Sequence, residues 1–235
     1  MSIENKDISK FYDGYTDRQE KWGIHVRHRT ILKLLKNCGL KPGSSILEVG
    51  CGIGTVTHLL GKYCRSGKIV AADISAKSIE VAKQKNRSFG NIEFVVSDMS
   101  DFSHKLKFDF IVLPDVLEHI PVEQHRNLFS RLKECTHENS VILINIPNPP
   151  YLRWVHKNRP DLLQIIDQPL DTCTLLNDVY ENDFYLHSLN VYSLSIEEGD
   201  YQSIVLKRGR YKALDRVTEL PQLKKSYLKQ VSKFY

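Results

Sequence analysis

A glycine-rich turn near the start of the chain has the composition of a nucleotide-binding corner. An apolar run, Ile46–Val49, is followed by glycines at alternate positions: Gly50, Gly52 and Gly54. Such a turn between a strand and a helix lets a ligand approach bare backbone at the edge of a sheet. The dinucleotide fingerprint would require a third glycine where this chain has Thr55, and Glu48 would place an anion beside a pyrophosphate. The turn therefore favours a nucleotide-like ligand, and Glu48 disfavours a pyrophosphate there.

Two further acids stand at the ends of the next two apolar runs. Asp73 follows Gly50 by 23 residues, where a carboxylate can accept both hydroxyls of a ribose. Dehydrogenases use this position as well, so Asp73 alone does not discriminate between enzyme classes. Asp98 ends the third run in the same manner.

The ordered segments resemble class I S-adenosylmethionine-dependent methyltransferases, whose first motif is acid-x-Gly-x-Gly-x-Gly. The segment Asp115-Val116-Leu117-Glu118-His119 closely resembles a motif of small-molecule methyltransferases such as those of quinone biosynthesis. The resemblance covers roughly residues 25–150. It implies S-adenosyl-L-methionine as cofactor, with Asp73 on the ribose and Asp98 on the adenine amino group. The cofactor-binding residues expected from it are Glu48, Gly50, Cys51, Gly52, Gly54, Asp73, Ile74, Ser97, Asp98, Met99, Pro114 and Tyr15.

Glu118 and His119 are the candidate catalytic residues. They stand where the fourth strand should meet a helix, beside the place that a methyl acceptor must occupy. In some relatives the equivalent His or Glu acts as a base or orients the substrate, and in many others the His only shapes the pocket. We expect His119 to take the proton if the acceptor is a hydroxyl. The remaining histidines show no metal-ligand spacing, so no metal is expected.

One tetrapeptide points to a different acceptor. Asn148-Pro149-Pro150-Tyr151 spells the motif of adenine-N6 and glutamine methyltransferases, but here it follows the fifth strand, about 33 residues later than in that family. We interpret it as a loop at the rim of the pocket. A small or carrier-linked polar acceptor, such as a sugar or a biosynthetic intermediate, with O-methylation, is favoured. N-methylation of nucleic acid or protein and a non-catalytic cofactor-binding protein are the alternatives, and a nicotinamide enzyme is a weaker one.

Alternating strand and helix patterns must position these residues. They predict a doubly wound α/β fold with a mostly parallel seven-stranded sheet and an antiparallel last hairpin, which the resemblance makes a Rossmann-like methyltransferase fold. The expected strands are 45–49, 68–74, 92–96, 108–113, 141–146, 185–194 and 201–207. The expected helices are 24–38, 55–64, 76–87 and 122–135, the first with Ile24, Ile31, Leu34, Leu35 and Cys38 on its apolar stripe.

We expect a single methyltransferase domain with five parts. These are an N-terminal helical lid (1–40), a cofactor-binding core (41–147), an acceptor-binding insertion (148–183), a terminal hairpin (184–207) and a basic tail (208–235). The lid aromatics Phe11, Tyr12, Tyr15 and Trp22 could cover the cofactor or belong to the core. The insertion carries side chains suited to a polar substrate, although a helix packed on the sheet would explain its leucines equally well: Tyr151, Arg153, Trp154, His156, Arg159, Asp167 and Gln168.

Composition and charge agree with a folded protein. The 235 residues are 41% hydrophobic and 26% charged, and no apolar stretch approaches the roughly 20 residues that span a bilayer. With no signal-like start and five cysteines without a paired spacing, we expect a cytoplasmic protein. The net charge is +5, but residues 207–235 carry +7, so nucleic acid is not an expected partner. The basic amphipathic tail could touch an anionic membrane surface, pack on the domain or form a homodimer contact.

Overall fold

The structure, a computed structural model, describes residues 8–14 and 23–208. The predictions made for Tyr15, Trp22 and all but the first residue of the basic tail lie outside the described residues. Residues 8–14 are helical. The seven strands are β1 (Ile46–Val49), β2 (Ile69–Asp73), β3 (Ile92–Val96), β4 (Phe108–Pro114), β5 (Thr136–Pro147), β6 (Phe184–Tyr192) and β7 (Tyr201–Arg208). The helices are α2 (Val26–Asn37), α3 (Thr55–Tyr63), α4 (Ala76–Lys85), η1 (Leu117–His119), α5 (Val122–Glu134), α6 (Pro149–Asn158), η2 (Pro160–Leu162) and α7 (Thr172–Glu181).

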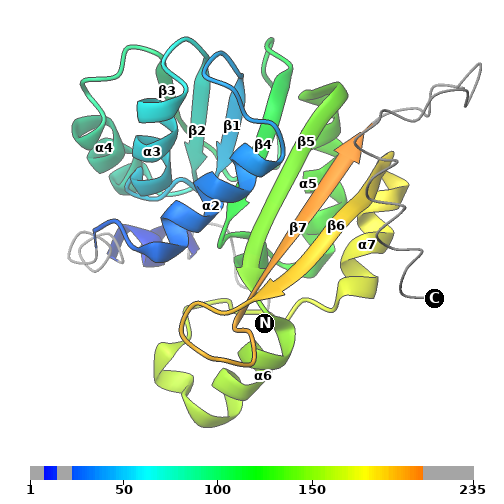
Figure 1. The fold of residues 1–235 in the computed structure, drawn as a ribbon. Helices are drawn as coiled ribbons and strands as arrows, with labels where there is room; N and C mark the ends of the chain where they lie inside the picture. Colours follow the sequence, from blue (N-terminus) through cyan, green and yellow to red (C-terminus); the bar gives the residue numbers. More distant parts are fainter. Residues whose placement is uncertain (1–7, 15–22, 209–235) are drawn as a thin grey trace, which may run out of the picture.

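The strands form one twisted sheet in the order β3-β2-β1-β4-β5-β7-β6 (Figure 1). The first five pair in parallel, and β7 runs antiparallel to both β5 and β6. The predicted fold class is therefore confirmed, including the antiparallel last hairpin. The strand order reverses between β1 and β4, and ligands of open α/β sheets bind beside such a reversal, at the carboxyl ends of the strands.

Helices cover both faces of the sheet, so the central strands are buried throughout. On one face Ile31 and Leu35 of α2 pack with Leu60 of α3, and on the other Phe129 of α5 and Val179 of α7 lie in the second core. Figure 1 shows α2 crossing in front of β1 and β4, with α5 and α7 behind the sheet. Side chains of β1 and β4 alternate between these two cores, which holds the carboxyl ends of the strands in a fixed register.

Three local features differ from the sequence-based prediction. Ile24, expected on the apolar stripe of the first helix, lies outside that helix and is 42% exposed, because the helix begins at Val26 after an N-cap at His25. Strand β5 starts at Thr136 rather than at residue 141. The insertion expected at residues 148–183, to which the sequence assigned no definite element, contains the regular helix α7, which packs on β6 and α5.

Among the residues that the structure describes, none of the helices combines the length and the apolar composition that crossing a bilayer requires.

Candidate active site

A cavity of about 230 Å³ opens at the carboxyl ends of the parallel strands. Its walls come from the turn between β1 and α3, from the ends of β2, β3 and β4, from the start of α2 and from the helical residues 8–14. Ten of the predicted cofactor residues line it: Glu48, Gly50, Cys51, Gly52, Asp73, Ile74, Ser97, Asp98, Met99 and Pro114. The fold thus gathers residues from four separate strand ends around one space.

The turn after β1 needs glycine for steric reasons. Gly50 has φ +72°, and a Cβ added there would lie 1.8 Å from a methyl carbon of Val116. Gly54 has φ +77° and caps the start of α3, and a Cβ added there would lie 2.5 Å from the side-chain nitrogen of Asn86. Gly54 does not line the cavity. Its position makes it part of the turn that shapes the cavity rather than part of the wall.

Glu48 offers an acidic group inside this cavity. The side chain is fully buried, and one carboxyl oxygen accepts a hydrogen bond from Thr57 Oγ1 at 2.7 Å. The other oxygen, Oε1, has no hydrogen-bond partner among the described residues. Burial raises the pKa of Glu48 to about 8, with a smaller contribution from the nearby Asp73. A cationic ligand beside Glu48 would restore its ionised form, so the site suits a positively charged group.

Asp73 is held rigidly at the end of β2. Its Oδ2 accepts from the backbone N–H of Gly52 at 2.7 Å, and its Oδ1 accepts from the backbone N–H of Ser75 at 2.9 Å. A carboxylate has about four lone-pair sites, so both oxygens keep capacity for further donors. Burial raises the pKa of Asp73, and the backbone donors oppose that shift. The group is oriented to receive hydroxyls from the cavity.

Asp98 and Met99 close the side of the cavity next to β3. Asp98 is exposed, and its Oδ1 accepts from the backbone N–H and the hydroxyl of Ser100 at 2.9 and 2.6 Å. Met99 is buried with φ +68°, a left-handed conformation that is uncommon for a side chain of this size. Such conformations occur where the surrounding structure imposes them, frequently beside binding sites.

His119 reaches the cavity from η1, opposite the glycine turn. The residue is 8% exposed, and its Nδ1 lies 2.5 Å from the carbonyl oxygen of Ile166. Its Nε2 lies 3.1 Å from the amide nitrogen of Gln164, another residue of the cavity wall. An amide nitrogen can only donate, so Nε2 accepts and Nδ1 carries the hydrogen. Burial lowers the pKa of His119, which leaves the ring neutral and Nε2 available as a base.

Glu118 lies behind His119 and not in the cavity wall. Its Oε1 is 3.8 Å from His119 Nε2, and its Oε2 has no hydrogen-bond partner among the described residues. Burial and the neighbouring Asp115 raise its pKa well above the ordinary range. The structure therefore separates the two predicted catalytic residues, since His119 lines the cavity and Glu118 does not.

Arg27 and Asp115 complete the cavity, and sequence reasoning missed both. Arg27 Nε is 3.2 Å from Asp115 Oδ2, and its Nη1 donates to the hydroxyl of Tyr201 at 2.7 Å. Asp115 directly follows the end of β4 and has a left-handed backbone conformation, with φ +54°. Because 174 positions separate Arg27 from Tyr201, their contact has no signal in local sequence patterns. Gln164 was missed for the same reason.

The N-terminal residues 8–14 cover one side of the cavity. Ser9 Oγ donates to the carbonyl oxygen of Ile74 at 3.2 Å, and Ser75 Oγ donates to Asp13 at 2.5 Å. Tyr12 lines the cavity with its ring centre 6.1 Å from that of His119. Of the four lid aromatics, Tyr12 thus borders the site, whereas Phe11 is not in the wall.

The predicted insertion contributes less to the wall than its composition suggested. Asn148 caps α6 and donates to the carbonyl oxygen of Gly199 at 3.0 Å, outside the cavity wall. Arg153 pairs with Asp171 on the surface, and Trp154 is half exposed and stacks on Tyr151. Only the stretch 164–168 reaches the site, through Gln164 and the residues that contact His119.

Comparison with known proteins identifies the nature of this domain. Residues 46–139 match the family model described as "Methyltransferase domain". Nodulation protein S of Sinorhizobium fredii is 32% identical over 94 residues, which are 40% of this chain and 42% of that protein. Malonyl-[acyl-carrier protein] O-methyltransferase 1 of Ilyobacter polytropus is 33% identical over 103 residues, which are 44% of this chain and 36% of that protein. The chain thus spans less than half of the length of these two relatives.

Solved structures of methyltransferases share the fold. Magnesium protoporphyrin IX methyltransferase from Synechocystis with bound S-adenosylhomocysteine superposes with a TM-score of 0.70 at 18% identity, covering 88% of this chain and all of that one. N-methyltransferase NodS from Bradyrhizobium japonicum gives 0.62 at 19% identity, covering 78% and 95%. The predicted resemblance is confirmed for residues 46–139, which match a methyltransferase domain, and the fold is that of these methyltransferase structures.

Proposed function

We propose that this protein is an S-adenosylmethionine-dependent methyltransferase that methylates a hydroxyl of a small or carrier-linked polar acceptor. One observation carries the proposal. The turn Gly50–Gly52, the oriented carboxylate of Asp73 and the neutral ring of His119 line the same cavity. The matched methyltransferase domain supports the reaction class.

The residues of the cavity fit the chemical groups of this cofactor. The unpartnered oxygen of Glu48 suits an ammonium group, since a buried carboxyl gains most from a cationic partner. The oriented carboxylate of Asp73 suits the two ribose hydroxyls, and Asp98 suits the amino group of adenine. When bound, S-adenosylmethionine supplies an electrophilic methyl group on a positively charged sulfur.

His119 would act on the acceptor. Methyl transfer from a sulfonium cancels charge, so much of the work of the enzyme is to hold the acceptor close to the methyl group and in line with it. A hydroxyl becomes a better nucleophile as it loses its proton, and Nε2 of the neutral His119 can accept that proton. The side-chain amide of Gln164 lies at the same nitrogen. When the acceptor binds, its hydroxyl would take the place of this amide at Nε2, and the displaced amide can then orient the hydroxyl. The burial of His119 also excludes water from the reacting groups.

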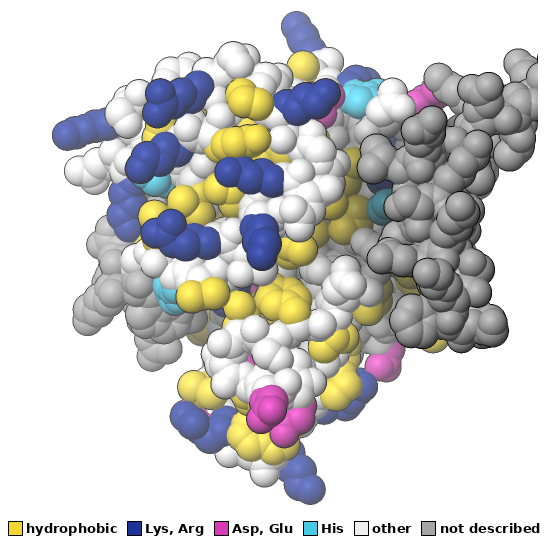
Figure 2. Space-filling view, in the orientation of Figure 1, with side chains coloured by type: hydrophobic (Ala, Val, Ile, Leu, Met, Phe, Trp, Pro, Cys, Tyr) yellow, Lys and Arg dark blue, Asp and Glu magenta, His cyan; other side chains and the backbone are white. Residues whose placement is uncertain are grey.

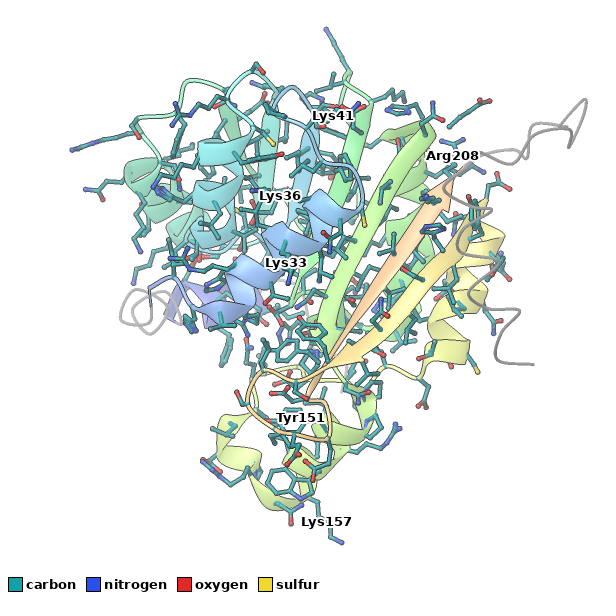
Figure 3. All side chains as sticks on the ribbon, in the orientation of Figure 1. Lys33, Lys36, Lys41, Tyr151, Lys157 and Arg208 are labelled. Carbon is teal, nitrogen blue, oxygen red and sulfur yellow. The ribbon has the colours of Figure 1, made fainter. Side chains whose placement is uncertain are left out.

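The basic face over α2 favours an acceptor or carrier with negative charge. At the cavity itself, the start of α2 contributes His25, Arg27 and His28, of which Arg27 pairs with Asp115 and His28 is neutral because burial lowers its pKa to about 4. Residues 23–68 contain eight Lys or Arg residues and one acid, the buried Glu48. Figure 2 shows Lys and Arg side chains gathered over the face that α2 crosses. Figure 3 places Lys33 and Lys36 on α2, and Lys41 beyond its end, at the end of the sheet away from the carboxyl ends of the parallel strands. A field of one sign raises the local concentration of an oppositely charged substrate or carrier, and the similar malonyl-[acyl-carrier protein] methyltransferase bears a carrier in its name.

N-methylation of a small amine is the second candidate. A similar solved structure is named an N-methyltransferase, NodS, and nodulation protein S is also among the similar sequences. The neutral His119 could take a proton from an ammonium acceptor in the same position. The cytoplasmic location, the homodimer and the contact of the basic tail with a membrane surface stay predictions from the sequence.

The experiment that tests the proposal is transfer of a labelled methyl group. The full chain is incubated with methyl-labelled S-adenosylmethionine and fractionated metabolite and carrier-protein extracts, and mass spectrometry identifies what gains label. We expect an O-methylated acceptor, with no labelling by Asp73→Ala. An N-methylated product would favour the second candidate, and binding without any labelled product would favour a non-catalytic cofactor-binding protein.

A further inference from the structure

The connection between η2 and α7 folds back over the short helix that carries His119. The backbone N–H of Gln168 donates to the carbonyl oxygen of Glu118 at 3.0 Å. The side-chain amide of Gln168 donates to the carbonyl oxygen of Ile120 at 2.7 Å. These bonds hold residues 164–168 against η1 on both sides of His119. The connection is therefore part of the rigid surroundings of the histidine.

Asp167 is the acidic residue that this arrangement brings to the far nitrogen of His119. Its Oδ1 lies 3.4 Å from His119 Nδ1, and its side chain is 9% exposed. Its Oδ2 accepts from the backbone N–H of Gln164 at 2.6 Å, which fixes the carboxylate in place. The carbonyl oxygen of Ile166 is a second acceptor at Nδ1. Two acceptors on this side keep the hydrogen on Nδ1 and leave the lone pair on Nε2.

The other charged groups around His119 do not replace Asp167. Glu118 approaches the opposite nitrogen, Nε2, and burial favours its neutral form. The charge of Asp115 is offset by its ion pair with Arg27. Among the described residues Tyr12 also lies nearby, with its ring centre 6.1 Å from that of His119. Asp167 is thus the carboxylate placed to interact with a charged imidazole through Nδ1.

We propose that Asp167 is a positioning residue that holds the ring of His119 with Nε2 toward the acceptor and stabilises the imidazolium formed during the reaction. The proposal rests on the proposed function, because it assigns a partner to the base of that reaction. In the step, the acceptor O–H bond breaks and its proton binds Nε2, while the oxygen forms a bond to the methyl carbon. The carbon–sulfur bond breaks and its electron pair stays on sulfur, which becomes a neutral thioether. Nδ1 keeps its hydrogen, and Asp167 takes up no proton.

The variant Asp167→Asn tests this role in the full chain. Asparagine keeps an oxygen for the backbone N–H of Gln164 and removes the negative charge. Nitrogen-15 NMR of histidine-labelled protein should show His119 titrating at lower pH, because the carboxylate favours the charged ring. The preference for hydrogen on Nδ1 should become weaker but remain, because the carbonyl oxygen of Ile166 still accepts there. The signals of His119 are assigned by their loss in His119→Ala.

Kinetics with the acceptor found by methyl labelling provides the second readout. We expect kcat of Asp167→Asn to fall about 10- to 100-fold, less than the loss of about 100-fold or more expected when the base itself is removed, with KM for S-adenosylmethionine changed less than about twofold. Asp167→Glu keeps a carboxylate and should recover most of the pH profile. Asp161→Asn is the matched control, since this acid of the neighbouring helix η2 pairs with Arg159 at the surface, and it should change neither readout.

The outcomes separate this proposal from the proposed function. Unchanged titration and tautomer of His119 in a folded Asp167→Asn protein overturn the role of Asp167, even when His119→Ala abolishes labelling. Full labelling by His119→Ala contradicts the proposed base, and with it the catalytic role of Asp167, although cofactor binding and methyl transfer would stand.

Discussion

The binding of S-adenosylmethionine should depend on pH through Glu48. Burial raises the pKa of this carboxyl to about 8, so at pH 7 the empty site holds it mostly protonated. A cationic ammonium group binds the ionised form, and the proton must leave when the ligand enters. For a pKa near 8 the ionised fraction at pH 6 is about a tenth of that at pH 7, so the dissociation constant should be about tenfold higher at pH 6, or about 1.4 kcal/mol.

Calorimetry measures this coupling directly. At pH 7 about 0.9 proton should be released per ligand bound, which appears as a dependence of the binding enthalpy on the ionisation enthalpy of the buffer. S-adenosylhomocysteine carries the same ammonium group without the sulfonium charge and should release the same amount. Glu48→Gln should bind more weakly and release no proton from this position. A dissociation constant independent of pH, or equal proton release by Glu48→Gln, would refute the assignment of Glu48 to the ammonium group.

The remaining predictions concern stability and the acceptor side of the cavity. Gly50→Ala should lower the free energy of unfolding by about 2–4 kcal/mol in urea denaturation, because it combines a positive φ with a Cβ placed 1.8 Å from Val116, and an unchanged midpoint would contradict this. Raising the pH from 5 to 8 should destabilise the ligand-free protein, since the folded state binds a proton at Glu48 that the unfolded state has lost above pH 4.5. Glu48→Gln should reduce that slope in the same denaturation series. His119→Ala should lower kcat about 100-fold or more while leaving cofactor affinity measured by calorimetry intact, and a parallel loss of both would indicate a structural role. Arg27→Met should cost about 2–3 kcal/mol of stability by leaving Asp115 without its cation, whereas Arg153→Met at the surface pair with Asp171 should cost less than about 1 kcal/mol.

The cofactor side of the site could be predicted from the sequence because it is built from local segments. The alternate glycines, Glu48 and Asp73 each sit at the end of a strand, and the carboxyl ends of neighbouring parallel strands meet at one edge of the sheet. The strand spans followed from short apolar runs, and Ile92–Val96 was predicted to the residue. Positive φ values at Gly50 and Gly54 agree with the turn that their spacing indicated.

The acceptor side could not be predicted because it depends on contacts between distant segments. Arg27 looks like an ordinary charged residue of a helix until the fold sets it between Asp115 and Tyr201. The contact of Asp167 with His119 is made by a loop whose path no periodicity specifies. Composition pointed to residues 148–183 but not to the residues in that stretch that reach the cavity, since charged side chains such as Arg153 serve the surface equally well.

The most direct test of the account is a crystal structure of the full chain soaked with S-adenosylmethionine. We predict that the ligand binds in the cavity, with its ammonium group beside Glu48, its ribose hydroxyls on the carboxylate of Asp73 and its methyl group facing His119. A ligand bound elsewhere, or an empty cavity that admits NADH in its place, would contradict it.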